Sequence, residues 1–260
     1  MGFDMILAAI SAGVIIGFVL ALVGGGGSIL AVPLLVYLVG VSSPHAAIGT
    51  AAVAVALNAA TSLAGHARSG NVKWPCAIAF AISGIIGAAL GAEAGKAMDG
   101  SRLLVLFGGL MILVGLSMLR PRSTIENTDV RLERSTASVL LPRLIPTGFC
   151  VGLLAGFFGI GGGFLIVPGL VMATQMPLRV AVGTSLVVVT ALGLTTATSY
   201  ALSGYVDWLL VGLMAIGGGI GAGIGIPLGK RVASHKRVME LGFASLVITI
   251  GGYVVLHGLT

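Results

Sequence analysis

Residues 17–34 are GFVLALVGGGGSILAVPL, and residues 152–169 are GLLAGFFGIGGGFLIVPG. Each stretch holds an apolar run, then a cluster of glycines, then a second apolar run that carries a proline. The chain is therefore an internal duplication in which a glycine-interrupted apolar element occupies the same place in each copy. The similarity continues at an offset of 134 residues, where Gly49-Thr50 matches Gly183-Thr184 and Trp74 matches Trp208.

Composition places the chain in a lipid bilayer. It is 57% hydrophobic and 8% charged, with a mean hydropathy of +1.12, whereas soluble proteins carry about 25% charged residues. Strands with alternating polar and apolar residues are absent, so we expect an all-α polytopic membrane protein. The net charge of +6 comes from basic residues in loops, where it sets membrane orientation, and we expect no nucleic-acid partner. Cys76 and Cys150 have no counterparts in the other copy, so we expect no disulfide framework and interpret both as small core residues.

Each copy divides into five apolar segments, of which the second is too short to cross a bilayer, since a span needs roughly 20 residues. The predicted segments are 5–23, 28–40, 45–66, 73–96 and 102–120 in the first copy, and 144–158, 164–174, 179–202, 207–229 and 237–257 in the second.

The distribution of Lys and Arg selects a topology. If the first two segments of each copy form a hairpin that enters and leaves on one side, twelve basic residues fall on one face of the membrane and two on the other. If they form one broken span, the division is seven and seven. The positive-inside rule favours the hairpin. We therefore predict two inverted repeats, 1–120 and 143–260, each a re-entrant or broken hairpin plus three transmembrane helices. A cytoplasmic linker, 121–142, joins them, and both termini lie outside.

The hairpin turns, Gly24–Gly27 and Gly159–Gly163, are called the glycine tips below. We expect them to approach each other near the bilayer midplane, each followed by a helix that begins at Ser28 or Phe164. Glycines expose backbone N–H groups, and a helix N-terminus attracts anions, so the tips favour a site for a small anion. The predicted substrate-binding residues are Gly24, Gly25, Gly26, Gly27, Ser28, Thr50, Asn58, Gly159, Gly161, Gly162, Gly163, Thr184 and Ser185.

Each of these residues also has an alternative, purely structural interpretation. The glycines could serve close helix packing alone, and Ser or Thr hydroxyls in membrane helices usually bond a carbonyl of the preceding turn. Asn58 could bond between helices or line a cavity. Glu93 and Lys96 are spaced as an i,i+3 ion pair. No clustered metal ligands and no nucleophile–base pair are apparent, so we expect no metal, no cofactor and no catalytic residues.

The duplicated glycine–proline element resembles that of the sulfite exporter TauE/SafE family of bacterial membrane permeases. Its G-x-G-G-G form is Gly159–Gly163 followed by Pro168, and a variant form is Gly24–Ser28 followed by Pro33. The resemblance implies a secondary transporter, usually an exporter, of small sulfur-containing anions such as sulfite or organosulfonates, in the bacterial inner membrane. Ser28 departs from the pattern, so the first tip is expected to bind differently. A channel or carrier for another small solute, a non-transporting assembly factor, and a homo-oligomeric state stay open.

Overall fold

The computed structural model describes residues 3–119, 132–159, 163–232 and 236–259, and these are helical almost throughout. Within these ranges eight helices are long and apolar enough to cross a membrane. The long helices are α1 (Phe3–Val23), α3 (Pro44–Arg68), α4 (Trp74–Lys96), α5 (Gly100–Leu119), α6 (Arg134–Phe157), α8 (Leu178–Leu202), α9 (Trp208–Val232) and α10 (Lys236–Leu259). The short elements are η1 (Gly24–Leu30), α2 (Ala31–Pro33), η2 (Leu34–Leu38) and α7 (Gly163–Thr174).

The all-α polytopic fold and the division of each copy into long segments and one short one are confirmed. One boundary differs: α6 begins at Arg134, so residues 134–142, expected in the linker, are helical. A capping box explains the early start, because the Glu133 N–H donates to the Thr136 hydroxyl at 3.0 Å and Glu133 accepts in return. Pro142 lies inside this helix. Residues 121–131 of the expected linker lie outside the described ranges.

The first arm of each hairpin is longer than a midplane turn would require. At 1.5 Å per residue, the 21 residues of α1 extend about 31 Å, which is enough to cross the hydrocarbon. Helix α6 is also a candidate span. Within the described ranges each copy therefore contains four long helices and one short segment, which agrees with the predicted hairpin, here with a long first arm, followed by three further helices. The chain still turns back after α1 and after α6, as the hairpin interpretation expected.

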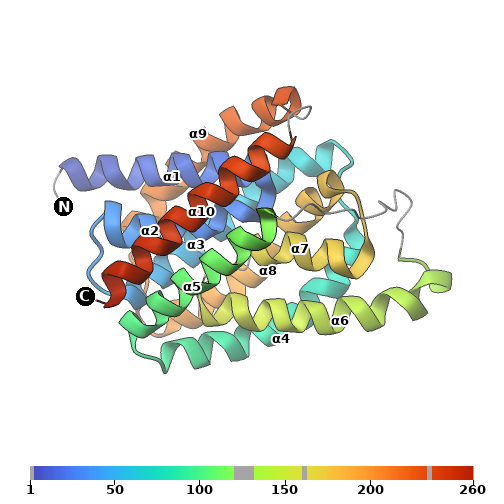
Figure 1. Cartoon of the computed structure of the whole chain (residues 1–260), viewed down its shortest axis with the longest axis horizontal. Helices are drawn as coiled ribbons and strands as arrows, with labels where there is room; N and C mark the ends of the chain where they lie inside the picture. The colour runs from blue at the N-terminus through green and yellow to red at the C-terminus, as the bar shows by residue number, and fades with distance from the viewer. Residues whose placement is uncertain (1–2, 120–131, 160–162, 233–235, 260) are drawn as a thin grey trace.

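The helices pair across the two copies (Figure 1). Helix α1 packs on α9, and α6, which is equivalent to α1, packs on α4, which is equivalent to α9. The other close pairs join equivalent helices, α3 with α8 and α5 with α10. The two ends of the chain lie at the same end of the bundle. Each of these helices thus packs on a helix of the other copy, as expected if a twofold axis relates the two copies.

Helix directions follow from the contacts of the glycines. Gly49, near the start of α3, lies against Tyr200, near the end of α8, whereas Gly193 in the middle of α8 lies against Ala56 in the middle of α3. Equivalent helices α3 and α8 are therefore antiparallel. Helices α5 and α10 behave in the same way, because Gly258, near the end of α10, lies against Val105, near the start of α5. Equivalent helices that run in opposite directions favour inverted repeats, and we carry the inverted arrangement forward as a proposal.

The outer surface is apolar, and the centre belongs to α3 and α8. These two helices have the largest buried share among the candidate spans. On α4 one face carries large exposed side chains at every fourth position, as expected of a lipid-facing stripe. These are Ile78, Ile82, Ile86 and Leu90. Cys76 is buried as expected, but Cys150 is exposed on α6, so only one of the two cysteines is a core residue.

Candidate functional site

The first glycine tip is itself helical. Gly24–Gly27 form the first part of the 3₁₀ helix η1, so no regular α-helix begins at Ser28, contrary to the sequence prediction. The segment folds back on α1 so closely that a Cβ atom at Gly27 would lie 2.5 Å from the Leu20 nitrogen and 3.0 Å from the Ile16 carbonyl oxygen. The change from 3₁₀ to α and then to a π-helical turn at Leu34 coincides with Pro33, which has no N–H to donate.

The second glycine tip differs in its backbone. Gly159 has φ of +65°, a conformation that suits glycine, and a Cβ atom there would collide with Cγ2 of Ile48 in α3. Helix α7 then begins at Gly163, one residue before the predicted start at Phe164. Gly161 and Gly162, both predicted to bind substrate, lie outside the described residues.

The contact between the two hairpins involves their short segments and not only their glycines. Segment η1 packs against α7 and α8, so the short elements of the two copies lie side by side. Gly159 lies against Ile48, eight residues before the middle of α3, which is about 12 Å along the helix axis. This contact places Gly159 away from the middle of α3, and the position of the tip relative to the bilayer midplane stays a prediction.

The Gly-Thr motifs have a structural function. The Thr50 hydroxyl accepts a hydrogen bond from the Asp207 N–H at 3.0 Å, and the Thr184 hydroxyl accepts one from the Lys73 N–H, also at 3.0 Å. Both threonines are fully buried. Asp207 and Lys73 are equivalent residues, directly before α9 and α4. Each threonine thus fastens the loop of the opposite copy, and a role in substrate binding stays a prediction.

The glycine of each motif makes room for the same loop. A Cβ atom at Gly49 would collide with the Tyr205 carbonyl oxygen, and one at Gly183 would collide with the Asn71 carbonyl oxygen. Both collisions are with backbone, which cannot move aside cheaply. The Gly-Thr pair therefore has the same role in both copies: the glycine leaves space for the loop backbone, and the threonine hydroxyl accepts a hydrogen bond from it.

Asn58 bonds between helices. Its side-chain nitrogen donates to the Met214 carbonyl oxygen of α9 at 3.5 Å, and the residue is buried. A Cβ atom at Gly218 would overlap the Asn58 amide, and one at Gly17 of α1 would overlap Gly218. Asn58 therefore lies where α1, α3 and α9 meet. Of the two interpretations left open for this residue, the interhelical bond has a contact in the structure.

Most other hydroxyls in the spans bond their own helix. Ser185, a predicted site residue, donates to the Val182 carbonyl at 2.8 Å. The same pattern holds for Thr61, Ser83, Thr174, Thr190, Thr195 and Thr198. Ser28, at the first tip, is fully buried.

A few buried polar atoms break this pattern. Within the described ranges, Ser62 Oγ, Thr196 Oγ1, Tyr200 Oη and His45 Nδ1 have no hydrogen-bond partner. Ser62 and Thr196 are 134 residues apart and hence equivalent. The repeat spacing alone could have paired these two residues, but no sequence pattern shows whether a hydroxyl is bonded.

Charged residues join α4 to α8 near one end of the bundle. Lys96 Nζ lies 2.7 Å from the Glu93 carboxylate, which confirms the i,i+3 pair, and donates to the Ser203 hydroxyl at 3.0 Å. Ser199 donates to the same carboxylate at 2.9 Å. These partners account for a carboxylate at position 93, so no role in proton transfer is needed to explain it.

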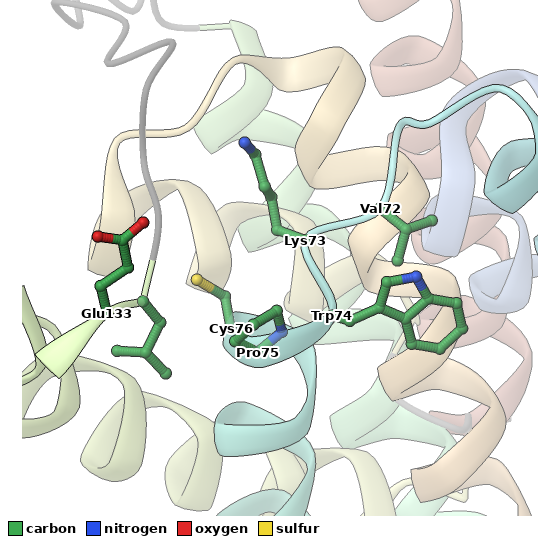
Figure 2. Close-up of a pocket in the computed structure, with 7 residues that line it drawn as sticks. Val72, Lys73, Trp74, Pro75, Cys76 and Glu133 are labelled. Carbon is green, nitrogen blue, oxygen red and sulfur yellow. The ribbon is translucent and has the colours of Figure 1, made fainter.

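A surface pocket of about 360 Å³ lies beside the start of α4. Figure 2 shows Lys73, Cys76 and Glu133 among the side chains around it. Lys73 comes from the loop before α4 and Glu133 from the residue before α6. None of the predicted substrate-binding residues lines this pocket, so it does not coincide with the glycine tips.

Comparison with known proteins identifies the relatives of this chain. The sequence model of the sulfite exporter TauE/SafE family matches residues 9–254. A probable membrane transporter protein of Xylella fastidiosa (strain 9a5c) is 44% identical over 255 residues, covering 98% of this chain and 97% of the relative. The probable membrane transporter protein YunE of Bacillus subtilis (strain 168) is 30% identical over 264 residues, covering 95% and 96%. No solved structure matches the chain.

Proposed function

Because the chain belongs to the sulfite exporter TauE/SafE family, whose members are membrane transporters and not enzymes, we propose that it exports small sulfur-containing anions such as sulfite or organosulfonates. The single observation that carries this proposal is the contact between η1 and α7, which belong to the short segments at equivalent places in the two copies. Discontinuous helices at a repeat interface are where secondary transporters bind their substrates.

The chemistry of these segments suits an anion that must be released again. Residues 24–38 and 159–174 contain no charged side chain, so binding would rest on backbone N–H groups, a helix N-terminus and hydroxyls. Helix α7 offers such an N-terminus at buried Gly163, and Ser28 offers a hydroxyl at the first tip. A buried arginine would hold the anion more tightly and slow its departure.

Movement of the two copies against each other would expose the anion to each side in turn. The antiparallel packing of α3 on α8 supports this proposal, because an inverted pair can exchange its conformations and so open at either end. Arg68 and Lys73 lie at the end of α3 and in the loop after it, and Arg179 lies in the first turn of α8. Because α3 and α8 are antiparallel, these ends lie on one side, which the positive-inside rule would assign to the cytoplasm of a bacterial inner membrane. Both termini would then lie outside.

The test is transport by the purified full-length chain in proteoliposomes. Uptake of radiolabelled sulfite, thiosulfate, sulfate, sulfoacetate and chloride is measured against protein-free vesicles. We expect sulfite or sulfoacetate to be carried and chloride to be excluded. Unlabelled substrate inside the vesicles should accelerate uptake of the labelled anion, since counterflow requires alternating access. Uptake of none of the sulfur anions would contradict the proposal, and uptake without counterflow would indicate a channel.

A further inference from the structure

Ser62 on α3 and Thr196 on α8 are equivalent residues with the same unusual property. Each is fully buried, and neither hydroxyl has a hydrogen-bond partner within the part of the chain that the structure describes. A buried hydroxyl without a partner costs free energy, so most are bonded in native proteins. The duplication places this cost at the same position in both copies, which indicates a function rather than an accident of packing.

The neighbouring residues show that the helix backbone is not the reason that these two hydroxyls lack hydrogen-bond partners. Thr61 and Thr195, one position earlier, are also equivalent to each other. Their hydroxyls donate to the carbonyls of Leu57 and Ala191 at 3.0 and 2.9 Å, the ordinary solution for a membrane helix. Ser62 and Thr196 therefore keep free hydroxyls beside residues whose hydroxyls are bonded to the backbone.

The two hydroxyls lie on the central, antiparallel pair of helices, on opposite sides of its middle. Gly193 of α8 is level with Ala56 of α3, so Thr196 is level with residue 53, nine residues from Ser62. At 1.5 Å per residue the two positions are about 14 Å apart along the helix axes. One small anion cannot touch both at once, so they would be separate positions.

Among the described residues, two more buried polar atoms without hydrogen-bond partners lie beyond Thr196, toward the end of α8. Tyr200 shares a helix face with Thr196 one turn later, is fully buried, and has no partner for its hydroxyl among the described residues. The His45 ring lies 6.5 Å from the Tyr200 ring, and its Nδ1 atom is also buried without a partner in the described ranges. These groups extend the unbonded polar atoms from the middle of α8 toward its end.

We propose that the hydroxyls of Ser62 and Thr196 are two equivalent hydrogen-bonding positions for the transported oxyanion, one in each copy. This inference rests on the proposed function and adds two positions on α3 and α8 to the short segments as places where its substrate is bound. Each hydroxyl donates to an anion oxygen while the anion is on its side of the middle. Passage from one position to the other then accompanies the change of access from one face of the membrane to the other.

The test compares Ser62→Ala and Thr196→Val with the matched controls Thr61→Val and Thr195→Val. Proteoliposome uptake is measured with the sulfur anion that the unaltered chain carries. Since hydrogen bonds to charged groups are the stronger ones, each site variant should raise KM about tenfold, and the controls should change it less than about twofold. Thr196→Ser, which keeps the hydroxyl, should restore the original KM.

Thermal unfolding in detergent separates binding from a structural role. Without anion, Ser62→Ala and Thr196→Val should keep or raise Tm, because they remove an unbonded buried hydroxyl. Addition of the sulfur anion that the unaltered chain carries should raise the Tm of that chain and of the controls, but not that of the Ser62→Ala/Thr196→Val double variant. A fall in Tm without anion would assign the hydroxyls to the fold and overturn the proposal.

Failure of this inference is distinguishable from failure of the proposed function. If the unaltered chain carries a sulfur anion and the site variants match the controls, the hydroxyl positions are wrong while the function stands. If the unaltered chain carries none of the sulfur anions, both are wrong.

Discussion

The hydroxyl oxygen of Thr50 lies 3.0 Å from the backbone nitrogen of Asp207 and accepts its hydrogen bond. Thr50 is six residues after the start of α3 in the first copy, and Asp207 directly precedes α9 in the second. The equivalent pair, Thr184 and Lys73, makes the same bond in the reverse sense between the copies. The two copies are thus joined by a reciprocal pair of bonds, one near each end of the bundle.

Loss of either bond should weaken the fold. Thr50→Val leaves the Asp207 N–H without its acceptor in a partly buried place, and we expect a loss of about 1–3 kcal/mol in the free energy of unfolding. The control is Thr61→Val on the same helix, whose hydroxyl bonds only its own backbone. Urea unfolding in detergent measures both. Because the two bonds are distant, Thr50→Val and Thr184→Val should add, and a control as damaging as Thr50→Val would contradict the prediction.

Adjacent glycines of α9 should differ in their tolerance of a methyl group. A Cβ atom at Gly218 would overlap the Asn58 amide, whereas one at Gly219 would meet nothing within 4 Å. Gly218→Ala should therefore lower Tm and the yield of monodisperse protein. Gly219→Ala should be neutral or stabilising, since alanine favours helix by up to about 1 kcal/mol over glycine. Equal Tm values for the two variants would contradict the close contact between Gly218 and the Asn58 amide.

Gly159 and Gly204 provide a second matched pair, because both have positive φ, +65° and +76°. At Gly204 an added Cβ meets nothing within 4 Å, so Gly204→Ala should cost only the backbone strain, about 1 kcal/mol. At Gly159 it would also collide with Ile48. Gly159→Ala should cost more and reduce anion uptake, and Ile48→Ala in the same chain should recover part of the loss. A Gly159→Ala variant that is as stable and as active as Gly204→Ala would contradict the close contact between Gly159 and Ile48.

Glu93 should prove structural and not a carrier of protons. Its carboxylate is held by Lys96 and Ser199, so Glu93→Gln should lower Tm while the pH profile of transport keeps its shape. Replacing both charged partners, as Glu93→Gln/Lys96→Gln, should cost less than the sum of the two single changes, because neither charge is then left alone. A shifted pH profile in Glu93→Gln would instead assign proton coupling to this residue.

Most of the fold could be predicted from the residue pattern. Segment 45–66 became α3 (Pro44–Arg68), and 179–202 became α8 (Leu178–Leu202), because apolar runs of spanning length have to satisfy their backbone as helices in lipid. The start of α6 was missed, since charged residues and Pro142 near its beginning have the composition of a linker. The contact of Gly159 with Ile48 could not be predicted, because segment length does not show where a turn lies relative to the other helices.

The candidate site was less predictable. The Gly-Thr motif was visible as a repeated pair, but its partner loop comes from the other copy, more than 100 residues away in sequence. Asn58 was recognised as a residue that needs a partner, and only the structure identified the Met214 carbonyl. Ser62 and Thr61 are indistinguishable in the sequence, because whether a hydroxyl bonds its own helix depends on its side-chain rotamer and its surroundings.

The sequence by itself determined the class of solvent, the helices and the duplication, because hydropathy, segment length and repeat spacing are properties of a single chain. Tertiary structure alone decided which helices exchange partners between the copies, which residues Gly27 and Gly159 contact, and which of the described hydroxyls have no partner. Those features depend on contacts between residues far apart in the chain, such as Gly17 with Gly218 and Thr50 with Asp207, and no local pattern records them.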